Sequence, residues 1–122
     1  MRKIILLTLL LFIVSVTCVS ANVKVNIDPK ISYIWADEKA VFDVRLENLK
    51  DGRDTITYVV QDIYWDAENQ KFDLSSNEII NFNLALEPSK NIDPGKYAVN
   101  VRFYSQLTEN DYDDYSFIVD LL

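Results

Sequence analysis

The feature that most constrains the fold is an alternation of apolar and polar residues with a period of two. Phe42, Val44 and Leu46, for example, are separated by charged residues. Successive side chains of a strand point to opposite faces, so this alternation predicts a strand with one buried face. The same alternation recurs over residues 23–27, 55–64, 80–86, 97–103 and 115–121, and shorter extended pieces lie at 31–35 and 72–74.

Turn signals divide the chain between these runs. Pro29 ends the first run, and Asp51-Gly52 is the sharpest turn because both residues tolerate positive φ. The segment 65–77 has the weakest pattern and leaves room for a helical turn. Short strands at a spacing of roughly eight to twelve residues, without a helical period, predict one all-β domain, a β-sandwich of about seven strands.

The first strand and the 31–35 piece are expected to lie at sheet edges. An edge strand exposes backbone groups, to which the strand of a partner can add. Lys24 and Lys30 equally suit a guarding role, because charged side chains on an edge discourage unwanted pairing.

The first 21 residues predict a secretory signal peptide. Arg2 and Lys3 precede an almost entirely apolar run from residue 4 to residue 14, and Val19-Ser20-Ala21 offers a small-residue cleavage site. Cleavage after Ala21 leaves one domain, residues 22–122, that is secreted or held at the cell surface. Two alternatives stay open. A lipid can be attached at Cys18, or the uncleaved leader can anchor the protein in the membrane.

The residue types that the chain lacks exclude several kinds of site. Cys18 is the only cysteine and lies in the leader, and the chain contains no histidine. These absences remove disulfides, thiol catalysis, the usual zinc ligand and the Ser-His-Asp triad. A hydrolase with two carboxylates needs a cleft that a small domain of short strands rarely forms. We therefore expect no enzymatic activity and no cofactor.

The charge of the domain argues against nucleic acid as a partner. Without Arg2 and Lys3, the chain has 10 basic and 19 acidic residues, a net charge of −9. Such a chain is repelled by phosphate backbones and by anionic membrane surfaces. Contact with a membrane is accordingly expected only through an uncleaved or lipidated leader.

One local pattern narrows the fold. The run from Asp93 through Gly95 and Tyr97 to Val99 resembles the tyrosine corner of immunoglobulin-like domains. The resemblance implies that the Tyr97 hydroxyl bonds to the backbone a few residues upstream and fixes the crossover between two sheets. Val99 stands where those domains often have a cysteine, and an apolar side chain there agrees with the missing disulfide.

A broader resemblance covers nearly the whole domain. The strand 42–48, the glycine turn after it, the run 54–58 and the segment 94–97 together resemble immunoglobulin-like modules of prokaryotic surface proteins. These modules include the cell-adhesion-related domains of bacteria and similar domains of archaeal envelope proteins. The resemblance implies an immunoglobulin-like Greek-key β-sandwich and lends no catalytic residue.

Two clusters of side chains are candidate sites. Asp111, Asp113 and Asp114, next to Glu109 and Asn110, form an acidic segment that suits a weak calcium site, or simply a solvated loop. The other candidate comprises three aromatic residues that the alternation does not explain, and these would suit a polysaccharide if exposed or the core if buried: Trp35, Tyr64 and Trp65.

The function that these observations favour is non-catalytic. We expect an exported module that binds or scaffolds an envelope or extracellular protein through rigid strands and loops. A carbohydrate-binding module and a calcium-stiffened structural spacer are the alternatives.

Overall fold

The computed structural model describes residues 23–107 and 111–122, which contain nine strands and no helix. The predicted signal peptide, residues 1–21, lies outside the described residues. Within them no segment is a helix of the length and apolarity needed to span a membrane. The strands are β1 (Val23–Ile31), β2 (Tyr33–Ile34), β3 (Ala40–Asn48), β4 (Asp54–Val60), β5 (Trp65–Asp66), β6 (Lys71–Leu74), β7 (Ile79–Pro88), β8 (Gly95–Ser105) and β9 (Tyr112–Leu121).

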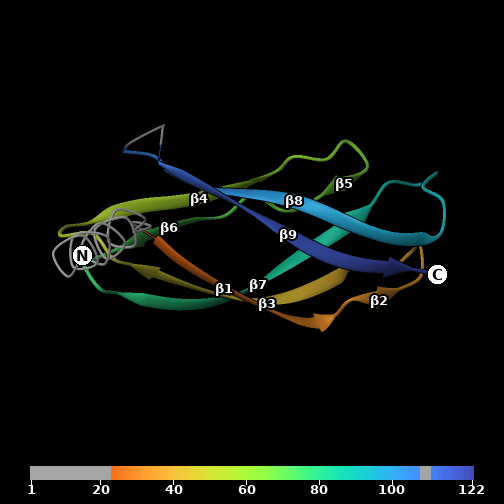
Figure 1. The fold of residues 1–122 in the computed structure, drawn as a ribbon, viewed down its shortest axis with the longest axis horizontal. Coiled ribbons are helices and arrows are strands. Elements are labelled where there is room, and N and C mark those ends of the chain that lie inside the picture. Colours follow the sequence, from red (N-terminus) through yellow and green to blue (C-terminus); the bar gives the residue numbers. More distant parts are fainter. Residues whose placement is uncertain (1–22, 108–110) are drawn as a thin grey trace, which may run out of the picture.

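The strands form two facing sheets, which Figure 1 shows as two layers. One sheet has the order β1-β3-β7-β5 and the other the order β2-β9-β8-β4-β6. Neighbouring strands run antiparallel except β2, which pairs with β9 in parallel. The predicted class is confirmed: the chain folds as an immunoglobulin-like β-sandwich. β8 lies at the centre of its sheet, and β1 and β2 lie at sheet edges, as expected.

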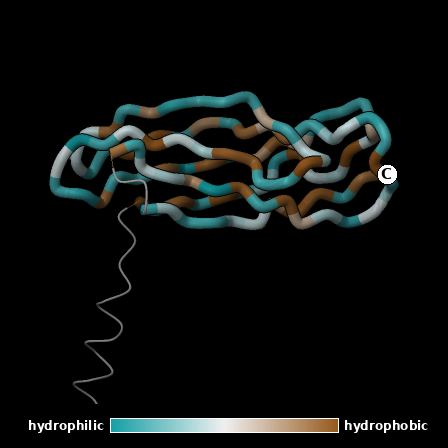
Figure 2. The backbone as a smooth tube through the Cα atoms, turned by 90° about the horizontal axis from the view of Figure 1, so that it is seen from above, coloured by the Kyte–Doolittle hydropathy of each residue, from teal (hydrophilic) through white to brown (hydrophobic). Residues whose placement is uncertain are grey.

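The period of two builds the core between the sheets. Along the strands, the apolar members of each alternating run are buried or partly buried, and most polar members face solvent. Apolar residues accordingly gather along the strands, while the loops at the two ends are largely hydrophilic (Figure 2). Aromatic rings from both sheets meet at the centre, where Phe42 and Phe117 pack edge to face at 4.9 Å between ring centroids.

The sequence predicted that the first strand ends at Pro29, but the strand continues beyond it. β1 continues to Ile31, with a shift of register against β3 between Pro29 and Ile31. Proline lacks a backbone N–H, so it is tolerated in a strand where that group would face away from the sheet. The edge position of β1 supplies this situation.

The segment after Asp51-Gly52 also departs from the prediction. Gly52 has a φ of 150°, but the turn carries the chain from one sheet to the other and closes no hairpin. β4 then ends at Val60, and the chain crosses back so that Trp65 and Asp66 pair with β7. The segment 65–77 therefore contains two short strands and no helical turn.

Candidate functional site

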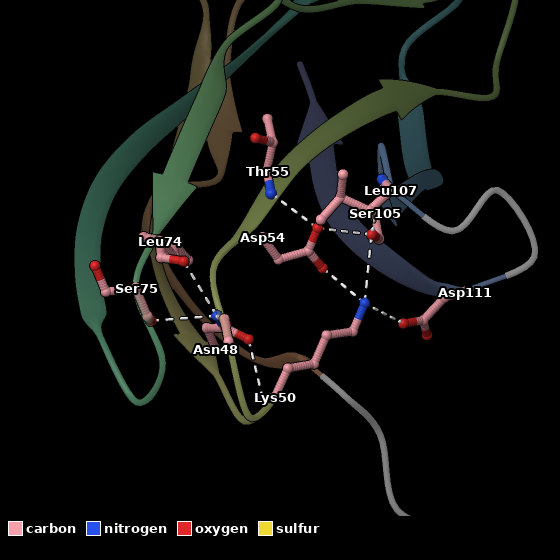
Figure 3. A network of polar contacts seen from close by, with 10 residues as sticks. Asn48, Lys50, Asp54, Thr55, Leu74, Ser75, Ser105, Leu107 and Asp111 are labelled. Carbon is pink, nitrogen blue, oxygen red and sulfur yellow. Dashed lines mark hydrogen bonds and ion pairs between the residues drawn. The ribbon is translucent and has the colours of Figure 1, made fainter.

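A network of polar side chains joins loops at one end of the sandwich (Figure 3). The Lys50 ammonium, from the β3–β4 connection, lies 2.7 Å from the Asp54 carboxylate and 2.9 Å from Asp111. Asp54 is buried, and its other oxygen accepts bonds from the Ser105 hydroxyl and the Thr55 amide, both at 2.8 Å. Every oxygen of this buried carboxylate is therefore satisfied, which a stable buried charge requires.

The charges in this network shift the pKa of Lys50. Burial alone would lower it, but the hydrogen bonds and charges of Asp54 and Asp111 outweigh burial, and the pKa rises above its usual value. Lys50 thus stays protonated and links β4 to the start of β9. This arrangement holds the β3–β4 and β8–β9 connections together and has a structural role.

The structure divides the acidic residues predicted as a calcium site. β9 begins at Tyr112, so Asp113 and Asp114 lie in a strand and point to opposite faces. Asp111 pairs with Lys50, and Asp114 pairs with Arg102. Across residues 23–107 and 111–122, no group of three or more such side chains is placed to hold a metal ion. Glu109 and Asn110 lie outside this part of the chain.

Asp113 points inward, beside Val25 and Phe103. Burial raises its pKa, and the nearby charges of Asp111 and Asp114 raise it further. A carboxylate in this setting is harder to ionise than a solvent-exposed one.

The three candidate aromatic residues do not form one surface. Trp35 is 61% exposed and Tyr64 is 54% exposed, but Trp65 is only 4% exposed. Of the two alternatives for Trp65, the structure shows burial in the core and not exposure to a ligand, because the crossover after Val60 turns its side chain inward. There its ring packs against Tyr97 at 5.7 Å between centroids.

The residues of the predicted tyrosine corner lie where the resemblance implies. The Tyr97 hydroxyl donates a hydrogen bond to the backbone carbonyl of Asp93, four residues upstream. Val99 is completely buried between the sheets. Gly95 has a φ of 153°, a conformation that residues with a side chain rarely adopt. These contacts fix the entry of the chain into β8.

A feature that the sequence analysis missed lies on the outer face of the five-stranded sheet. The Arg102 guanidinium donates two hydrogen bonds to the Asp114 carboxylate, at 2.8 and 3.1 Å, and stacks 3.9 Å above the centre of the Tyr112 ring. The bond from Arg102 lowers the pKa of Asp114 below its usual value. We call Arg102, Tyr112 and Asp114 the β8–β9 cluster.

Arg102 and Tyr112 of the β8–β9 cluster border a shallow hollow of about 630 Å³. Val59 and Gln61 of the neighbouring β4 side and Tyr104 of β8 also line it. Arg102 pairs in register with Asp114 across the β8–β9 hairpin. β8 and β9 follow one another in sequence, so their alternating patterns could have been aligned as a hairpin. That alignment would have placed Arg102 opposite Asp114 and identified the cluster.

The face that carries the cluster is electrically balanced. Its outward-facing charged residues are Lys71, Lys96, Arg102, Asp73, Asp114 and Asp120. Three positive and three negative side chains cancel here, although the whole chain has a net charge of −7. The excess negative charge therefore lies elsewhere on the molecule.

No family model matches the chain, and no curated protein matches it. Among solved structures, the fold is similar to that of a FixG-related protein from Vibrio parahaemolyticus (TM-score 0.65, 9% identity, 84% of this chain and 98% of the other). It is also similar to the cupredoxin domain of amoB from Nitrosocaldus yellowstonii (TM-score 0.64, 9% identity, 84% and 88%). A third similar structure is a CARDB domain from Pyrococcus furiosus in complex with di-metal ions (TM-score 0.53, 14% identity, 82% and 87%). At these identities the likeness establishes the fold alone.

Proposed function

We propose that this chain is an exported, non-catalytic β-sandwich that binds or scaffolds a partner protein through the outer face of its five-stranded sheet. The observation that carries the proposal is the β8–β9 cluster beside its hollow. Arginine and tyrosine are enriched among the residues that dominate binding energy at protein interfaces. Here both are held in a fixed arrangement before any partner arrives, which reduces the entropy lost on binding.

The electrostatics of this face suit burial against a protein. Covering an unpaired charge is costly, but Asp114 already neutralises Arg102 with two hydrogen bonds. A partner can therefore cover the cluster without leaving a buried charge unpaired. The zero net charge of the face also spares a partner the repulsion that it would meet elsewhere on this acidic chain.

A matched pair of substitutions tests the docking face. Val59 and Ile79 are equally exposed, each at 40%, but they lie on the outer faces of different sheets. We expect the immobilised chain to capture a specific protein from an envelope extract of its own organism, and Val59→Asp to abolish the capture. Ile79→Asp should leave it intact. Equal capture by both variants would refute the assignment of the face.

Export is the second part of the proposal and has its own test. It is supported by the basic start, apolar run and small-residue site of residues 1–21. N-terminal sequencing of the protein recovered from outside the cytoplasm should begin at Asn22. A chain found only inside the cytoplasm, with Met1 retained, would contradict export without touching the docking face.

A neutral polysaccharide is a second candidate ligand, favoured by Trp35. Its exposed indole borders a shallow hollow that is also lined by Asp37 and Glu38, whose oxygens can accept bonds from sugar hydroxyls. A glycan array should show binding that Trp35→Ala abolishes and Val59→Asp preserves. Absence of any glycan signal from the intact chain would remove this candidate.

A further inference from the structure

We propose that two copies of the chain associate by antiparallel pairing of their β1 strands, centred on Asn26. This inference concerns a different edge from the docking face and does not depend on the proposed function. β1 is nine residues long and, among the described strands, forms an edge of the four-stranded sheet, with β3 as its only neighbour there. Such an edge is a template for another strand.

The direction of the backbone groups shows which residues of β1 are available. Asn48 of β3 uses both its N–H and its C=O toward the β7 side, at 3.0 Å to Glu78 and 2.8 Å to Asn77. Its register partner in β1, Val23, must then direct its own groups away from β3. The alternation continues along the strand, so Val25 and Ile27 also direct N–H and C=O to the open edge.

Observations on Pro29 and Val25 agree with this direction of the backbone groups. Pro29 falls on the same alternate set, where its missing N–H costs no bond to β3. Burial and the charge of Asp113 raise the pKa of Tyr115, while a hydrogen bond with the backbone of Val25 acts in the opposite direction. The direction of this effect agrees with a Val25 N–H that points away from β3, as the alternation requires.

Charge complementarity selects the register of the pair. With Asn26 at the two-fold axis, Val25 exchanges backbone hydrogen bonds with Ile27 of the second copy. Lys24 then lies directly opposite Asp28, once on each side of the axis. Centring on Ile27 would instead place Lys24 opposite Lys30, and centring on Val25 would place it opposite Asn26. Of these three registers, only the one centred on Asn26 forms two opposite-charge pairs.

Asp28 also needs a cation at this position. It lies directly opposite Asp43 of β3, and like charges in such a pair destabilise a sheet. Arg45 lies opposite Asn26, yet within the described residues no ion pair joins it to either carboxylate. Lys24 of a second copy would supply the missing positive charge at the outer side of Asp28.

The geometry of β1 makes the contact between the two copies weak and determines how the two copies are oriented. Pro29 and the register shift after it confine pairing to residues 24–28, so the dimer should be weak and concentration-dependent. The two-fold axis of an antiparallel strand pair is perpendicular to the sheet. The five-stranded sheets of both copies would therefore lie on the same side and present two docking faces in one direction.

A cysteine placed on the axis tests the register directly. In a non-hydrogen-bonded antiparallel pair, the two facing Cα atoms are close enough for a disulfide. We expect Asn26→Cys in the full chain to form a disulfide-linked dimer under mild oxidation. Asn83→Cys, exposed on the same outer face but in the interior strand β7, should not. The unsubstituted chain controls for Cys18 if the leader is retained. Equal cross-linking of all three would overturn the proposal.

A charge exchange gives an independent readout by sedimentation. Asp28→Lys creates two like-charge pairs and should weaken association by about tenfold. The double variant Lys24→Asp with Asp28→Lys restores both pairs and should restore association to the level of the unsubstituted chain. Circular dichroism checks that each variant remains folded. Failure of the double variant to recover, with its fold intact, would rule out the Lys24–Asp28 contact.

Discussion

Tyr97 performs two tasks at the entrance to β8. Its hydroxyl bonds to the backbone of Asp93, while its ring packs against the Trp65 ring. The Trp65 indole nitrogen is buried and has no hydrogen-bond acceptor among the described residues. An orphan donor of this kind costs free energy, so the packing around Trp65 has to compensate for it. The aromatic pair of Tyr97 and Trp65 is part of that packing.

Replacing Tyr97 by phenylalanine separates these two tasks. The ring contact with Trp65 remains and the bond to Asp93 is lost, so the free energy of unfolding should fall by about 1 kcal/mol. Urea denaturation followed by circular dichroism measures this change. Tyr33→Phe is the control, because Tyr33 is largely exposed. Equal stability of the two variants would mean that the Tyr97 bond contributes nothing.

The two tryptophans should differ in fluorescence. Trp35 is in contact with water and Trp65 is not, so a soluble quencher such as acrylamide should reach only part of the emission. Trp35→Phe should remove the quenchable, red-shifted component and leave a blue-shifted one. A quenchable component that persists in this variant would place Trp65 at the surface.

Tyr97 and Trp65 show which single-residue features could be predicted from the sequence and which could not. Tyr97 could be predicted because its bond is to a residue four positions away, within one recognisable pattern. Trp65 could not, because its burial depends on the chain leaving one sheet after Val60 and joining the other. No local pattern encodes that crossing.

At the scale of elements, the pleat of β9 determines the directions in which the acidic side chains point. Neighbouring residues of a strand face opposite ways, so a cluster that is dense in sequence is divided in space. Asp114 points outward to Arg102, and Asp113 points inward. The prediction treated these residues as a loop because it could not locate the first residue of the strand.

Calcium should accordingly have little effect. Two of the three carboxylates already pair with cations, and the third faces the other way from Asp114. We expect millimolar Ca²⁺ to leave the melting temperature unchanged in differential scanning calorimetry, with Mg²⁺ as the control for ionic strength. A rise specific to Ca²⁺ would show that the acidic residues do converge on an ion.

Asn48 is a buried polar residue at the end of β3 that joins neighbouring loops. Its buried amide nitrogen donates to the carbonyls of Gly52, Leu74 and Ser75 at 2.8 to 3.2 Å, and its oxygen accepts from the Lys50 amide. Asn48→Ala would remove these four hydrogen bonds at a buried position and should cost about 2–3 kcal/mol of stability. Chemical denaturation measures it, with exposed Asn83→Ala as control. A loss no larger than that of the control would contradict this role.

At the scale of the molecule, alternation was sufficient to predict two facing sheets, since it determines which side of each strand is buried. It does not determine which strands become neighbours. The hollow beside Arg102 is lined by side chains from the β4 side, β8 and β9. The β1 edge exists because β3 pairs with one side of β1 only. Both surfaces arise from pairing between strands, and a single sequence shows such pairing only where a short hairpin connects them.

The whole fold should lose stability in alkaline solution. Burial raises the pKa of Tyr58 to about 12, and the charge of Glu68 adds to the shift. In the unfolded chain the same hydroxyl ionises near its ordinary value of about 10. Between these values the unfolded state releases the proton and the folded state keeps it, so stability falls as the pH rises from about 10 to 12.

Tyr58→Phe tests this contribution. Lys50 also keeps its proton in the folded state, because Asp54 and Asp111 raise its pKa, so the variant should still weaken with pH, but less steeply than the unsubstituted chain. The measurement is the urea midpoint across this pH range, with Tyr33→Phe as the exposed control. The variant also loses the 2.5 Å bond from the Tyr58 hydroxyl to the Glu68 carbonyl, which lowers its stability at every pH. The slope with pH, and not the absolute midpoint, is therefore decisive, and an unchanged slope would exclude Tyr58 as a source of alkaline unfolding.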